Sequence, residues 1–69
     1  MIKELDYRQA TSPEYLQMLA TDFPWVIVGN TDDDLTAVYV AHDPNDAMTL
    51  NLDKVQCQPI NEYIQNIIL

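Results

Sequence analysis

The spacing of apolar and polar residues predicts three strands in the middle of the chain. Residues 25–28 form a continuous run of strand-forming side chains, typical of a central strand that is buried on both faces. Residues 35–41 follow as a second strand, close enough in sequence to form a hairpin with the first. Residues 48–53 alternate again and predict a third strand. This alternation changes phase near Asp53 and Lys54, which indicates a bulge or a turn there.

The segment before the first strand predicts a helix that begins near residue 12. Ser12 can act as its N-cap, with Pro13 at the first helical position, where the missing N–H costs nothing. Alternatively, Thr11 and Glu14 form a capping box one residue earlier. The helix is expected to end before Pro24, because proline disfavours helical geometry at the residue that precedes it.

A second helix is expected after Pro59, where apolar residues recur at helical spacing. Its stripe consists of Ile60, Tyr63, Ile64, Ile67 and Ile68. Residues 2–9 fit a short edge strand or an ordered arm. The pattern therefore predicts one α+β domain over residues 1–69. We expect a three-stranded antiparallel meander, with a short N-terminal fourth strand as an option and two helices packed on one face.

Charge is the outlying property of the composition. Eleven acidic residues stand against three basic ones, for a formal net charge of -8. Residues 9–53 contain no lysine or arginine, and most of their acids fall at expected turns. Direct binding to nucleic acid or to anionic lipid is disfavoured because both would repel the chain. A basic surface on a larger protein is the partner that this charge favours, although acidic turns also serve solubility alone.

The cysteine content and the apolar runs bear on the compartment. Cys57 is the single cysteine, so an intramolecular disulfide cannot form, and we expect a reducing cytoplasm. The first residues lack the apolar segment of a signal peptide, and no apolar run is long enough to span a bilayer. We therefore expect no membrane association. For a phage-encoded protein, the compartment would be the cytoplasm of the host cell.

Two segments contain residue types that can bind metal ions. Residues 30–34 resemble the first half of a calcium loop, but Leu35 and Ala41 occupy the positions of the turn glycine and the bidentate glutamate. A solvated hairpin turn is the simpler interpretation. His42, Asp43 and Asp46 could supply metal ligands, yet the same residues form a proline-containing turn with Asx caps. We predict no metal site and no cofactor.

Catalytic chemistry has little support in this sequence. Cys57 could act as a nucleophile with His42 as its base, but no motif brings the two together, and a lone cysteine in an apolar pattern is usually a core residue. The chain also has one glycine, which leaves little room for a phosphate-binding loop. We therefore predict no catalytic residues and a protein that is not an enzyme.

The favoured hypothesis is a small inhibitor that occupies a basic, nucleic-acid-binding surface of a larger protein. Carboxylates placed like phosphates would attract the same lysine and arginine groups. Small acidic phage inhibitors of restriction or CRISPR defence look similar in size and charge, a similarity of composition only. The alternative is a structural or assembly protein, such as a phage particle component or an oligomer subunit, that uses apolar contacts. The predicted partner-binding residues are Asp22, Asp32, Asp33, Asp34, Asp43, Asp46, Tyr7 and Tyr15.

Overall fold

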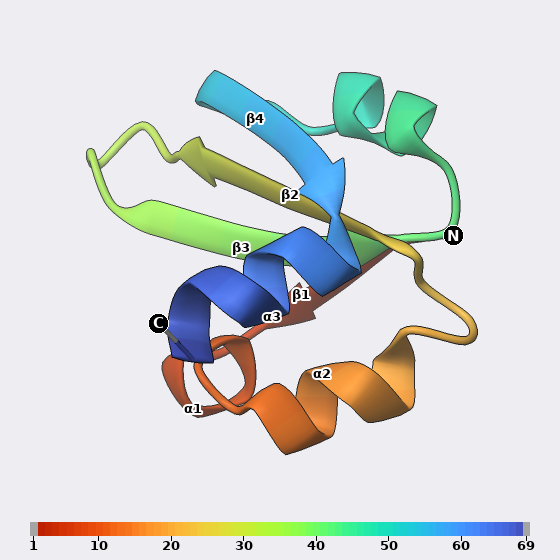
Figure 1. Ribbon diagram of the computed structural model, residues 1–69. Helices are drawn as coiled ribbons and strands as arrows, with labels where there is room; N and C mark the ends of the chain where they lie inside the picture. Colours follow the sequence, from red (N-terminus) through yellow and green to blue (C-terminus); the bar gives the residue numbers. More distant parts are fainter. Residues whose placement is uncertain (1, 69) are drawn as a thin grey trace.

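A four-stranded antiparallel sheet carries helices against its face in the computed structural model, which describes residues 2–68 (Figure 1). The α+β class predicted from the sequence is confirmed. The elements in chain order are β1 (Ile2–Leu5), α1 (Tyr7–Ala10), α2 (Pro13–Leu19), β2 (Trp25–Asn30), β3 (Thr36–Ala41), the 3-10 helix η1 (Pro44–Thr49), β4 (Asp53–Pro59) and α3 (Ile60–Ile68).

The order of strands in the sheet is β1-β3-β2-β4, which differs from the expected meander. β2 and β3 form the predicted hairpin, but β4 pairs with β2 rather than with β3, and β1 takes the free edge of β3. Since all three pairings are antiparallel, β1 runs parallel to β2, and β3 runs parallel to β4. One strand lies between the two members of each parallel pair, so the connection between them must cross over a face of the sheet. The α1–α2 segment makes the first crossing and η1 makes the second.

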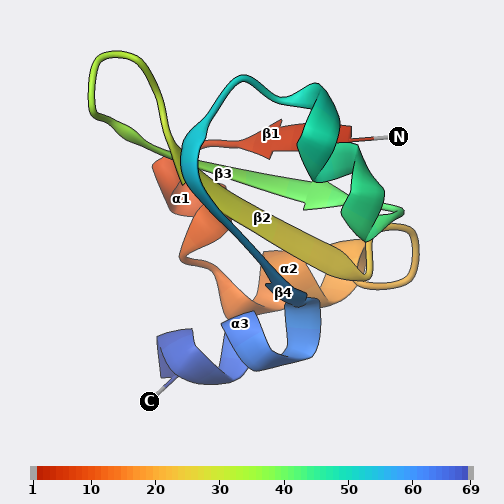
Figure 2. The same ribbon diagram turned by 90° about the horizontal axis from the view of Figure 1, so that it is seen from above.

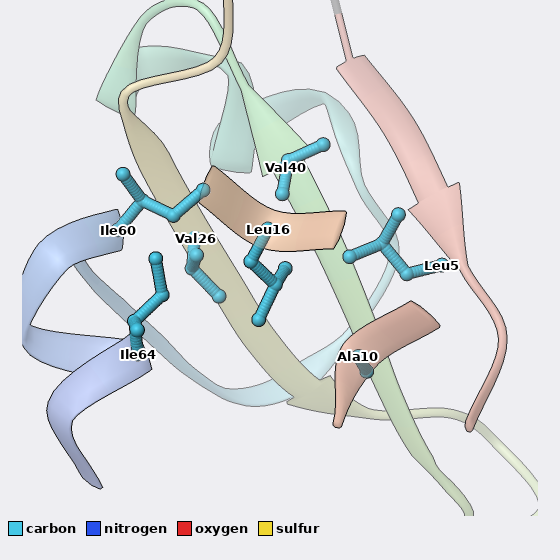
Figure 3. Close-up of a cluster of buried hydrophobic side chains, with 7 residues drawn as sticks. All are labelled: Leu5, Ala10, Leu16, Val26, Val40, Ile60 and Ile64. Carbon is cyan, nitrogen blue, oxygen red and sulfur yellow. The ribbon is translucent and has the colours of Figure 1, made fainter. Parts of the chain in front are cut away.

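The main core lies between the sheet and the three α-helices (Figure 3). Leu16 of α2 sits in the middle of this core and is fully buried, with Ile60 and Ile64 of α3 on one side and Leu5 and Ala10 on the other. Val26 and Val40 supply the sheet floor. Each fully buried aliphatic side chain contributes roughly 1.5–3 kcal/mol before conformational entropy is subtracted. Of the stripe predicted after Pro59, Ile60 and Ile64 are buried and Tyr63 and Ile67 pack against the core, whereas Ile68 is 64% exposed.

The opposite face of the sheet is covered in part by η1, which contacts β2, β3 and β4 (Figure 2). Ile27 is fully buried on this face, so the prediction that β2 is buried on both sides is confirmed. The strand predicted over residues 48–53 is wrong. Asp43 caps a 3-10 helix with its carboxylate, which accepts a hydrogen bond from the Asn45 N–H at 2.9 Å, and Pro44 occupies the first helical position. This local capping chemistry overrides the apolar alternation.

The structure also tests the predicted start of α2 and the predicted irregularity near Lys54. Ser12 caps α2 by accepting a hydrogen bond from the Tyr15 N–H, as predicted. The alternative capping box at Thr11 does not form, because Thr11 ends α1 instead. The irregularity predicted near Lys54 is present: the register of β2 and β4 shifts there, and Lys54 adopts a φ of 53°.

Candidate functional site

The loop between β2 and β3 presents three consecutive carboxylates at its tip. Thr31 closes this loop, because its N–H donates to the Leu35 carbonyl at 2.8 Å and its hydroxyl accepts from the Leu35 N–H at 3.2 Å. Asp32, Asp33 and Asp34 are all exposed. The loop projects beyond the ends of its strands in both views (Figures 1 and 2). A hydrogen-bonded turn thus holds three negative charges away from the body of the sheet.

Two further carboxylates lie at the same end of the sheet. Asp53 begins β4 and pairs in register with Asn30, the residue that ends β2. Asp6 follows β1, whose last residue, Leu5, pairs with Val38 near the start of β3. We call Asp6, Asp32, Asp33, Asp34 and Asp53 the acidic end. Arg8 and Lys54 are the basic residues within or next to these segments, so negative charge is in excess here.

A cleft of about 300 Å³ opens at this end of the molecule. It lies where β1, α1, the start of β3 and α3 meet. The residues that line it are Leu5, Asp6, Tyr7, Ala10, Thr11, Thr36, Val38 and Tyr63. Thr36 lies only two residues from Asp34, so the cleft and the charged loop tip are parts of one continuous region.

The walls of the cleft are held in place by specific hydrogen bonds. Asp6 caps α1 with one carboxylate oxygen, Oδ1, which accepts from the Gln9 N–H at 2.8 Å. The Tyr63 hydroxyl donates to the Ala10 carbonyl at 3.0 Å and so fixes α3 against α1. Burial raises the pKa of Tyr63 above its ordinary value. The cleft is therefore built from elements that are fixed to one another.

The remaining predicted aspartates lie at the opposite end of the sheet. This end is marked by Trp25, which pairs with Ala41 on β3 and with Pro59 on β4. Asp22 precedes Trp25 by three residues, and His42 and Asp43 directly follow Ala41. Asp43 caps η1, and the Asp46 carbonyl accepts a hydrogen bond from the Thr49 hydroxyl at 2.7 Å. The Asp22 carbonyl lies 3.3 Å from Nδ1 of His42. The five steps of β2 place these residues roughly 17 Å from the acidic end.

The two predicted tyrosines differ in their surroundings. Tyr7 lines the cleft and is 83% exposed. Tyr15 is half-buried against the core, and its hydroxyl accepts hydrogen bonds from Lys3 at 3.0 Å and from Gln9 at 3.3 Å. The structure therefore places Tyr7 beside the acidic end and ties Tyr15 into the contacts between β1, α1 and α2.

The segments considered for metal binding and catalysis have other roles in the structure. Among residues 2–68, three or more histidine, cysteine or acidic side chains do not gather where they could hold a metal ion. Cys57 is exposed on β4, contrary to its expected place in the core, and desolvation raises the pKa of its thiol. Strand spacings place it roughly 14 Å from His42. Within the same range, no helix combines the length and the apolar character needed to cross a membrane.

Sequence reasoning identified the charged loop but missed the cleft beside it. The cleft depends on the pairing of β1 with β3, which brings Leu5 next to Val38, and on Tyr63 reaching Ala10. No motif marks these residues, and the only local signal was the Asp6–Gln9 spacing of a capping box. A search of protein-family models, curated proteins and solved structures finds nothing that matches this chain.

Proposed function

We propose that this protein is a small non-enzymatic inhibitor that binds a basic surface of a larger protein through its acidic end. The observation that carries the proposal is the hydrogen-bonded β2–β3 loop, which holds three exposed carboxylates beyond the sheet. Asp53 and Asp6 extend the negative charge across the same end. Because hydrogen bonds between Thr31 and Leu35 hold the loop, its backbone loses little conformational freedom on binding, which favours recognition over mere solubility.

The basic surface that we propose is a nucleic-acid-binding site. Such a site carries lysine and arginine residues that contact phosphates, and closely spaced carboxylates compete for the same groups. The net charge of -8 would also speed the encounter with a positively charged partner. We propose a target in the cytoplasm of a bacterial cell, within the class of nucleic-acid-binding defence proteins that phage-encoded inhibitors block.

The test is affinity purification from a bacterial lysate with the full chain as bait, at low and at high salt. We expect a basic protein to be captured at low salt, to be lost at high salt, and to be displaced by added DNA or RNA. Mass spectrometry then names the partner. Capture that is insensitive to both salt and nucleic acid would refute the mimicry.

A second candidate function, assembly through apolar contacts, is favoured by the outer edge of the sheet. β4 is exposed along nearly its whole length and leaves one backbone edge unpaired in the sheet. Val55 on this strand and Met48 on η1 are exposed apolar residues. The assembly function requires concentration-dependent self-association with weak salt dependence, which light scattering measures. A strictly monomeric chain that binds no particle or assembly would exclude it.

A further inference from the structure

We propose that the cleft at the acidic end accepts an arginine side chain of the basic partner. This inference rests on the proposed function and makes it more specific. The loop tip alone would supply only a long-range attraction between the two proteins. The cleft adds a defined pocket for one side chain of the partner. The cleft volume of about 300 Å³ lies at the small end of ligand pockets, which suits a single long side chain.

The floor of the cleft suits the aliphatic part of arginine. Leu5 is 6% exposed, Ala10 is 5% exposed, and Val38 is half-buried, so the innermost lining is apolar. Arginine commonly lays its methylene stem along such surface while its charged head remains near water. A short acidic or polar side chain would gain nothing from this floor.

The rim of the cleft suits a guanidinium group. The Oδ1 atom of Asp6 is engaged in capping α1, while its carboxylate retains acceptor capacity at the other oxygen. Tyr7 and Tyr63 also line the cleft, and guanidinium groups stack favourably on tyrosine rings. The residues of α1 and its C-cap that line the cleft are Tyr7, Ala10 and Thr11, which share one helix face at i, i+3 and i+4. Arg8 is not on this face, so its positive charge does not line the cleft.

Charge selects arginine over an uncharged side chain of similar length. Thr36 lies on the rim of the cleft, and Asp34, the last of the three loop carboxylates, precedes it by two residues. The three carboxylates therefore produce a negative potential around the cleft. Arginine is favoured over lysine because its planar guanidinium group can stack on an aromatic ring and, at the same time, donate hydrogen bonds to a carboxylate.

The probe for this cleft is the peptide acetyl-Gly-Arg-Gly-amide, titrated into the full chain and followed by NMR. The matched probe carries citrulline, which has nearly the same shape but a neutral urea group. We expect the arginine peptide to shift the signals of Leu5, Tyr7, Val38 and Tyr63 with a dissociation constant on the order of millimolar. The citrulline peptide should bind at least about threefold more weakly, because the charge is lost.

Two variants separate the cleft from the general charge of the chain. Asp6→Asn removes one charge but keeps an N-cap residue, so α1 should persist while arginine binding weakens about threefold to tenfold. Thr36→Trp fills the cleft without changing charge and should abolish the shifts at Leu5 and Val38. Thr21→Trp, an exposed position in the turn after α2, is the matched control and should bind like the wild type. Circular dichroism verifies the fold of each variant.

The outcomes separate this inference from the proposed function. Shifts confined to residues 32–34, or equal binding of the arginine and citrulline peptides, would overturn the cleft as an arginine site. The same holds if Thr36→Trp binds as the wild type does. None of these results removes the salt-sensitive capture of a basic protein from a lysate. Conversely, failure of that capture, with the cleft shifts intact, would refute the inhibitor and leave an arginine-binding cleft.

Discussion

Aspartates lie at both ends of the sheet, but the two ends use them differently. At the end that contains η1, the Asp43 carboxylate caps the 3-10 helix, and Asp46 is also engaged in interactions within the chain. At the acidic end, Asp32 and Asp33 are exposed, and their side chains form no hydrogen bond or ion pair with any of residues 2–68. Local charge density is therefore a poor guide to which acids are available to a partner.

The two ends of the sheet also differ in backbone conformation. Among the described residues, the non-glycine residues with positive φ are Asp34, at 62°, and Lys54, at 53°. Asp34 belongs to the acidic end, and Lys54 directly follows Asp53 of the acidic end. Positive φ costs a non-glycine residue roughly 1 kcal/mol, and such strain is commonly found where a structure supports a function. The end that carries the exposed Asp32 and Asp33 is thus also the end at which the backbone adopts positive φ.

Charge reversal at the two ends should have the largest and most unequal effect. Asp32→Lys with Asp33→Lys should weaken partner binding about a hundredfold or more, because attraction becomes repulsion at the contact. Asp34 is left unchanged because aspartate tolerates its positive φ. The matched control, Asp22→Lys with Glu62→Lys, changes the net charge from -8 to -4 in the same way.

Surface plasmon resonance with the purified partner measures both double variants. We expect the control to lose about tenfold or less, through the long-range field alone. Equal losses in the two variants would mean that net charge, rather than the acidic end, controls binding.

Gly29→Ala should destabilise the junction that positions Asp53 at the acidic end. A Cβ atom on Gly29 would lie 2.8 Å from the Leu52 Cβ and 3.3 Å from the Asp53 carbonyl oxygen, so backbone must shift. We expect a loss of about 1–3 kcal/mol in the free energy of unfolding, as for other overpacked sites. Urea denaturation followed by circular dichroism measures this loss, and an unchanged midpoint would refute the close packing.

Alanine substitution at the two ends should separate structural aspartates from available ones. Asp43→Ala removes the cap of η1 and should cost about 1 kcal/mol of unfolding free energy. Asp33→Ala should change stability by no more than about 0.5 kcal/mol, because its side chain is exposed and forms no hydrogen bond or ion pair with residues 2–68. Both values come from urea denaturation. Equal costs would show that the loop tip also supports the fold.

Glycine substitution in β4 should have the smallest effect and a sign that depends on position. Lys54→Gly should stabilise the fold by up to about 1 kcal/mol, because glycine adopts positive φ without strain. Gln56→Gly, at a regular position paired with Val28, should instead destabilise by about 0.5–1 kcal/mol. Thermal denaturation can resolve the pair, and destabilisation by both substitutions would contradict the assigned bulge.

Most elements of the fold could be predicted because their signals are local. Pro13 and Ser12 mark the start of α2, the run at 25–28 marks β2, and the stripe after Pro59 marks α3. The strand order could not be predicted, because pairing of β4 with β2 is non-local and competes with an equally plausible meander. The turn at residues 42–46 was predictable from Asp43 and Pro44, but the strand over 48–53 was predicted wrongly because the 3-10 helix continues to Thr49 despite the apolar alternation.

The candidate site was predictable in its charge and unpredictable in its shape. Residues 32–34 stand out in the sequence as an acidic turn, and the structure places them at an exposed loop tip. The cleft needs the register of Leu5 with Val38 and the contact of Tyr63 with Ala10 across 53 residues. Side chains drawn together from four elements leave no spacing pattern that a single sequence can reveal.

The most direct test of the account is the salt dependence of the dissociation constant for the captured partner. The tip variant combines Asp32→Asn, Asp33→Asn and Asp34→Asn, and its matched control combines Asp22→Asn, Asp43→Asn and Glu62→Gln. We expect the wild type and the control to lose affinity steeply as salt rises, while the tip variant binds about 10- to 100-fold more weakly at low salt with a shallower slope. A tip variant with wild-type affinity and slope would contradict the account and leave the carboxylates of the acidic end with no role beyond solubility.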